Sequence, residues 1–173
     1  QTDKLIIAPL LGFTLLGNYQ LGIQFIAVFQ LLPLTVMKFT LPHDATGRSN
    51  KNLKIITILT SIGFTALIIF LSPILIPIFF DDFIFIVDII QILSLSLTPM
   101  AISSAYSSKF LGAEKSKIVF AGMGILVISH ICGILILGNI LGIIGIAISY
   151  VLAMTIHAIF YFIMDLRKIE SKP

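Results

Sequence analysis

Long runs of apolar residues without a charged side chain dominate this chain. Asp, Glu, Lys and Arg are absent from four segments: Leu5–Met37, Ile55–Phe80, Ile89–Ser108 and Ile118–Met164. A helix needs about 20 mostly apolar residues to cross the hydrocarbon core of a bilayer. The runs are continuous and do not alternate with a period of two, as the strands of a membrane β-barrel would. The pattern therefore predicts an all-α, polytopic membrane helical bundle, because a backbone in lipid must satisfy its own hydrogen bonds.

Turn-forming residues divide the apolar runs into about six helices. The stretch "LLGNYQ" divides the first run, since Gly17 and Asn18 are turn formers, and "LGNILG" divides the last run. Pro73 and Pro77 are expected to kink the end of the third helix, and the fourth expected helix continues through Pro99 in its middle. The expected helices cover residues 4–16, 19–41, 53–80, 83–110, 117–137 and 141–166.

Composition and charge agree with a membrane protein and argue against nucleic-acid binding. The chain is 58% hydrophobic and 11% charged, and its mean hydropathy is +1.11. An ordinary globular domain has about 25% charged residues. The net charge of +3 does not indicate nucleic acid, because the basic residues fall between the apolar runs, where the positive-inside rule explains them.

The basic residues also predict how the chain is oriented. When the six helices are counted, all eleven Lys and Arg fall on one side: Lys4, Lys38, Arg48, Lys51, Lys54, Lys109, Lys115, Lys117, Arg167, Lys168 and Lys172. The turns on the other side contain none. We therefore expect a multi-pass protein of the cell membrane with both termini of this segment in the cytoplasm. The stretch "PHDATGRSNKNLK", residues 42–54, is interpreted as a solvated topology anchor with no role in chemistry.

Four stretches, in this order and at this spacing, resemble polysaccharide flippases. They are "TDKLIIAPLLGFTLLGNYQLGIQF", "PIFFDDFIFIVDIIQILSLSLTPMAISS", "KFLGAEKSK" and "GNILGIIGIAIS". These flippases export lipid-linked oligosaccharides and belong to the multidrug/oligosaccharidyl-lipid/polysaccharide superfamily. The resemblance implies that residues 1–173 form a C-terminal six-helix lobe of a two-lobe transporter, with an N-terminal lobe elsewhere in the same protein. The start "QTDKLII" fits a cut through a longer chain.

The second expected helix carries the clearest polar face. At about 100° per residue, five polar side chains share one side of it: Gln20, Gln24, Gln30, Thr35 and Lys38. Polar groups facing lipid are costly, so this side must meet protein or a wet cavity. The resemblance implies that it lines the substrate pathway, where Lys38 either snorkels or meets an entering diphosphate. Hydrogen bonding between packed helices remains the alternative.

Two histidines and a short polar stripe are further candidates. His130 and His157 lie in the fifth and sixth expected helices, where an imidazole can relay protons or bond a nearby backbone carbonyl. Gln91, Ser94 and Thr98 share one side of the fourth helix, which is typical of close helix packing.

The inventory of reactive residues favours transport over catalysis. The single cysteine, Cys132, offers no disulfide or zinc spacing, and we expect no cofactor and no metal. No Gly-rich phosphate loop or Ser/His/Asp arrangement occurs. The expected function is the outward flipping of a polyprenyl-diphosphate-linked oligosaccharide, with membrane lipid and that substrate as partners. The open alternatives are a multidrug or lipid II exporter, an integral membrane enzyme of glycan assembly, and a scaffold without a cavity.

Overall fold

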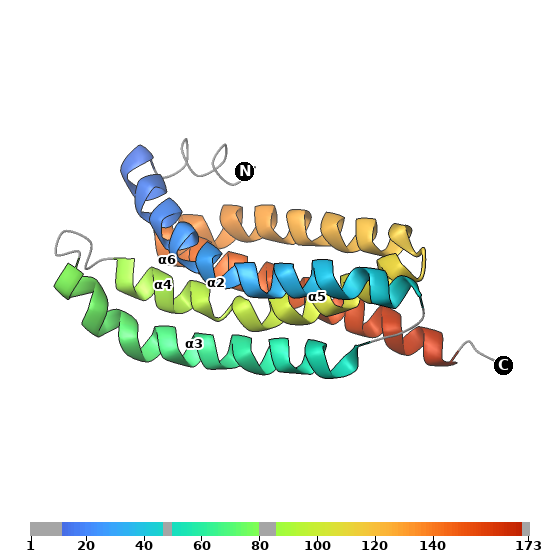
Figure 1. Cartoon of the computed structure of the whole chain (residues 1–173). Helices are drawn as coiled ribbons and strands as arrows, with labels where there is room; N and C mark the ends of the chain where they lie inside the picture. Colours follow the sequence, from blue (N-terminus) through green and yellow to red (C-terminus); the bar gives the residue numbers. More distant parts are fainter. Residues whose placement is uncertain (1–11, 47–49, 80–85, 171–173) are drawn as a thin grey trace.

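The computed structural model describes residues 12–46, 50–79 and 86–170, nearly all of which lie in α-helices (Figure 1). No strand occurs within these ranges, which confirms the all-α prediction. The elements are α2 (Phe13–Ala45), α3 (Lys51–Phe79), α4 (Ile86–Ser94), α5 (Leu97–Gly112) and α6 (Ser116–Glu170).

Four helices in the described ranges are long and apolar enough to cross a membrane. They are Leu16–Ala45, Lys51–Ile78, Ile86–Gly112 and Ser116–Leu166. Large apolar side chains also point outward, with Phe70 72% and Phe120 80% exposed, as expected for a surface that faces lipid. The chain is therefore a multi-pass membrane bundle.

The last of these helices is a hairpin of two antiparallel segments. In Figure 1, α6 runs the length of the bundle, turns, and returns beside α5 to its C-terminal end. The turn is at Gly142, whose φ of 60° and ψ of −136° are readily adopted only by glycine. Just before it, Asn139 Nδ2 donates a hydrogen bond to the Leu135 oxygen at 2.6 Å. The division expected at "LGNILG" is confirmed.

The division expected at Gly17 and Asn18 is wrong. Both residues lie inside α2, which begins at Phe13 after Gly12, a residue with a φ of 86°. Glycine in a helix costs roughly 1 kcal/mol, whereas an unsatisfied backbone group in lipid costs several. Tyr19 also anchors this part of the helix, because its side chain is fully buried in the core. Most of the expected helix 4–16 lies outside the described residues.

The fourth expected helix is broken into α4 and α5. Leu95 and Ser96 leave the helix, and their N–H groups bond the oxygens of Ile92 and Leu93 three residues back. Pro99 explains the break, because it has no N–H to donate to Leu95 and its ring would clash with that carbonyl. The prediction of one helix through Pro99 is corrected: the chain breaks one turn before the proline.

The broken helix forms the centre of the bundle. Both α4 and α5 contact α2, α3 and α6. The core that they share contains Ile26 of α2, Ile68 of α3, Ile89 and Leu93 of α4, and Ile146 of α6. Gln91 Nε2 donates to the Ile69 oxygen at 2.9 Å, and Thr65 Oγ1 donates to the Ser94 oxygen at 3.0 Å. These bonds tie α4 to α3, so the stripe of Gln91 and Ser94 serves helix packing.

One end of the bundle collects the basic residues of the described helices. The end of α2, the start of α3, the end of α5 and the start of α6 lie together at that end (Figure 1). The lysines on or next to these helix ends are Lys51, Lys54, Lys109, Lys115 and Lys117, and Lys38 lies two turns inside α2. We call this the basic end. The clustering is as expected for the residues that the structure describes.

Candidate functional site

The polar residues predicted on the second helix do not all share one environment. Gln24, Thr35 and Lys38 are exposed on a side of α2 that points away from its neighbours. The opposite side is buried against α4 and α5 and contains Tyr19, Ile26, Pro33 and Thr40. Exposed apolar side chains such as Leu31, 61% exposed, lie between the polar residues on the exposed side. The three polar residues Gln24, Thr35 and Lys38 are here called the outward polar face. It has no partner within the described bundle.

The other two predicted residues lie closer to the core. Gln20 is half-buried, and Gln30 Nε2 donates a hydrogen bond to the Tyr150 hydroxyl at 3.2 Å. His130 packs edge-on against the same tyrosine, with ring centroids 5.4 Å apart. Tyr150 thus joins Gln30 of α2 to His130 in the first half of α6. For Gln30, the structure therefore shows a hydrogen bond between packed helices, which was the alternative to a position in the pathway.

The second histidine belongs to a different cluster. His157 is buried, and its ring lies 4.4 Å from that of Tyr161, which donates to the Val119 oxygen. Within the described ranges, neither ring nitrogen of His157 has a hydrogen-bond partner, so the expected carbonyl contact is not formed. His130 and His157 are therefore not linked into one relay by any contact described here, and a proton-relay role stays a prediction.

The basic stretch interpreted as a plain topology anchor contains a buried ion pair. Lys54 Nζ lies 2.5 Å from Asp44 Oδ2, and their side chains are 12% and 3% exposed. Ser108 Oγ donates to the same carboxylate oxygen at 2.5 Å and also shares a hydrogen bond of 2.9 Å with Thr40 Oγ1. Asp44 Oδ1 has no partner among the described residues. The pair joins α2, α3 and α5, and this role was missed.

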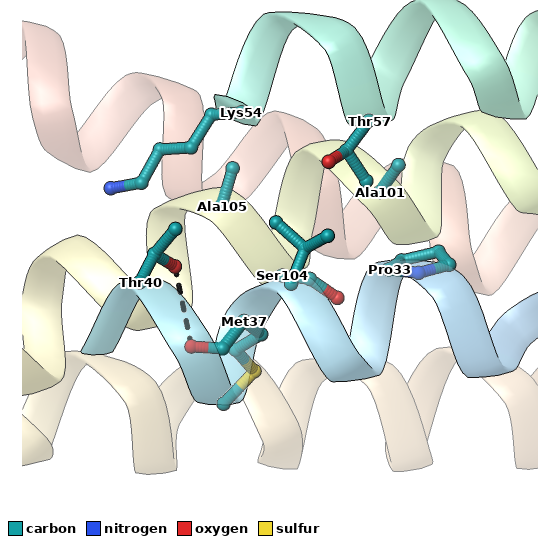
Figure 2. Close-up of a pocket in the computed structure, with 9 residues that line it drawn as sticks. Pro33, Met37, Thr40, Lys54, Thr57, Ala101, Ser104 and Ala105 are labelled. Carbon is teal, nitrogen blue, oxygen red and sulfur yellow. Dashed lines mark hydrogen bonds between the residues drawn. The ribbon is translucent and has the colours of Figure 1, made fainter. Parts of the chain in front are cut away.

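Small residues allow the helices to approach at this point. A Cβ added to Gly112 would lie only 2.7 Å from the backbone of Asp44, so the end of α5 touches the end of α2. Thr40, Lys54 and Ser104, from α2, α3 and α5, are among the residues that line a void of about 10 Å³, and Figure 2 shows them as sticks. That space is at the lower limit for one water molecule.

The sequence did contain a signal for the Asp44–Lys54 ion pair: two opposite charges ten residues apart, on either side of a predicted loop.

A larger cavity of about 440 Å³ adjoins the ion pair. It lies at the basic end between α3, α5 and the second half of α6. A second ion pair lines it: Lys109 Nζ donates to both carboxylate oxygens of Asp165, at 2.6 and 2.8 Å. This pair is more open, with side chains 52% and 16% exposed. We call this space the basic-end cavity.

The chemistry available in these places is binding chemistry. Within the described ranges, no three His, Cys, Asp or Glu side chains lie close enough to hold a metal ion. The outward polar face offers an amide, a hydroxyl and an ammonium group, which can bond the hydroxyl and phosphate oxygens of a polar ligand. The described residues thus form a membrane bundle with an apolar exterior and a broken helix at its centre. One exposed side of α2 carries polar groups that no other described helix covers.

Comparison with known proteins points to a specific fold. No family model and no curated protein matches the sequence. Among solved structures, the chain is similar to lipid II flippase MurJ in an inward closed conformation, with a TM-score of 0.81 and 21% identity. The match covers 88% of this chain and 36% of that flippase, so the chain spans about a third of its length. The similarity shows the fold: the chain has the helical arrangement of part of that flippase. That residues 1–173 form a C-terminal lobe stays a prediction.

Proposed function

We propose that this chain is one lobe of a transporter that flips a lipid-linked glycan precursor across the cell membrane by alternating access. The observation that carries the proposal is the fold shared with a lipid II flippase over 88% of the chain. The outward polar face of α2 supports it, because polar side chains facing lipid are costly and this face needs a wet cavity or a second lobe.

The substrate that we propose is a polyprenyl-diphosphate-linked oligosaccharide, and lipid II is the alternative. Both carry a saccharide and a diphosphate on a long isoprenoid. Gln24 and Thr35 match the hydroxyl groups of the sugar part, and Lys38 matches the phosphate oxygens. The second lobe of the same protein would supply the opposite wall of the pathway, and no nucleic acid is involved.

We propose further that the basic end faces the cytoplasm, as the positive-inside rule predicts. Single cysteines at Asn50, at the basic end, and at Asn139, at the α6 turn, test this in a Cys132→Ser background. Both asparagines are exposed. An impermeant thiol reagent added to intact cells is expected to label position 139 and to leave position 50 unlabelled until the cells are opened. The reverse pattern would contradict the orientation.

Altering the outward polar face is expected to reduce export without unfolding the lobe. In the full-length protein, Gln24→Leu and Lys38→Ala should each lower export at least about fivefold, the equivalent of roughly one hydrogen bond. The matched control is Lys117→Ala, which removes a lysine at the same end but on α6. Surface glycan in a flippase-deleted strain is the readout, with membrane abundance measured alongside.

Two strains separate the substrates. Restored polysaccharide export in a strain lacking its oligosaccharide flippase would support the proposed substrate. Restored growth after depletion of a lipid II flippase would support the alternative. Full export by the double variant Gln24→Leu, Lys38→Ala at normal abundance would show that the outward polar face is not the pathway.

A further inference from the structure

The lining of the basic-end cavity has a charged zone and an apolar zone. The charged zone consists of Asp44, Lys51, Lys54, Lys109 and Asp165, and the apolar zone includes Ile55, Ile58, Ile102 and Ala105. Along α3, the seven helical steps from Lys51 to Ile58 span about 10 Å. The cavity therefore runs from the membrane interface, where α3 begins, toward the hydrocarbon layer.

The charges of this lining are nearly balanced, with one lysine left over. Lys54 is paired with Asp44, and Lys109 is paired with Asp165. Lys51 lies exposed at the first position of α3 and forms no ion pair with any residue that the structure describes. Three lysines against two aspartates leave the lining with a net charge of +1. A ligand that matches it carries one negative charge.

We propose that the basic-end cavity is a binding site for an anionic phospholipid whose headgroup carries a single phosphodiester, such as phosphatidylglycerol. Its phosphate lies at Lys51, beside Lys109, and an acyl chain follows Ile55 and Ile58. The volume of about 440 Å³ lies in the usual range for ligand sites. A diphosphate would carry more negative charge than this lining neutralises. The lipid is a bound component, distinct from any transported substrate, and the proposal does not rest on transport.

Charge substitutions at Lys51 test the site directly. The full-length protein, purified in detergent, is titrated with phosphatidylglycerol, and bound lipid is counted by native mass spectrometry. A lysine near an anionic lipid contributes enough to change affinity about fivefold. We expect Lys51→Gln to weaken binding about fivefold and Lys51→Glu about 25-fold. Lys117→Gln is the control, since Lys117 is exposed at the same end and outside the lining.

Competing ligands decide whether the cavity holds a phospholipid or the transported substrate. Glycerophosphoglycerol, the same headgroup without acyl chains, is expected to compete only weakly, because it cannot fill the apolar zone. Unchanged affinity in Lys51→Glu, or an equal loss in Lys117→Gln, would overturn the proposal. Displacement of phosphatidylglycerol by a polyprenyl diphosphate lipid would also overturn it, since the cavity would then belong to the substrate. Export is measured separately, so the two proposals fail independently.

Discussion

Replacing Asp44 with Ala is expected to destabilise the bundle by about 3–5 kcal/mol, the usual effect of removing one partner of a buried ion pair. The loss leaves the Lys54 ammonium group without its counter-charge, in a side chain that is only 12% exposed in the intact bundle, and it removes an acceptor of the Ser108 hydroxyl. Because the pair joins α2 and α3 and Ser108 adds α5, the loss acts on three helices. Unfolding of the full-length protein in mixed micelles with increasing SDS measures the change.

Two comparisons make this prediction specific to a buried pair. The double variant Asp44→Asn, Lys54→Met removes both charges and should recover a large part of the lost stability, because no unpaired charge then remains buried. Asp165→Ala breaks the more open pair with Lys109 and should cost about 1 kcal/mol or less. If Asp44→Ala is no more destabilising than Asp165→Ala, the pair does not hold the three helices together.

Replacing Gly145 with Ala is expected to destabilise the α6 hairpin by about 3 kcal/mol, at the upper end for overpacking. Gly145 lies three residues after the turn at Gly142, and a Cβ there would overlap the backbone oxygen of Leu137. A backbone atom cannot move aside as the end of a flexible side chain can. The two halves of α6 must therefore separate at the turn, which the same SDS titration would detect.

The matched control is Gly124→Ala, a change of the same size in the same element. A Cβ added to Gly124 meets no atom within 4 Å. Alanine is favoured over glycine within a helix by roughly 0.5–1 kcal/mol, so this variant should be as stable as the original or slightly more so. Equal effects from the two substitutions would contradict the close approach at the turn.

The sequence predicted a helix boundary correctly when the boundary depends on the local backbone. It failed where packing against other helices decides whether the helix continues. The turn at "LGNILG" was predictable because Gly142 adopts a backbone conformation that other residues avoid. Gly17 and Asn18 gave a similar signal, yet the helix continues through them next to the buried Tyr19. Pro99 was noted inside the fourth expected helix, but the break that it causes was not predicted. The helix breaks at Leu95 and Ser96, one turn before the proline, where its missing N–H leaves the Leu95 carbonyl without a helical partner.

In the candidate site, too, local spacing was predictable from the sequence and contacts between distant residues were not. Helical spacing placed Gln24, Thr35 and Lys38 on one side of the helix at about 100° per residue, and all three are exposed in the structure, while their role in a pathway stays a prediction. The same rule also included Gln30, which the structure turns toward Tyr150, 120 residues away in the chain. The Asp44–Lys54 pair was hidden because its burial depends on Ser108 and Gly112 of α5.

By itself, the sequence determined that this protein is a helical membrane bundle and that the lysines of the described helices gather at one end. Hydrophobicity and the need to satisfy backbone hydrogen bonds within each segment act locally, so they can be recognised along the chain. The tertiary structure alone decided which polar groups are sealed between helices and which are left facing outward. That choice depends on contacts between residues far apart in sequence, such as Asp44 with Ser108, and no local pattern records them.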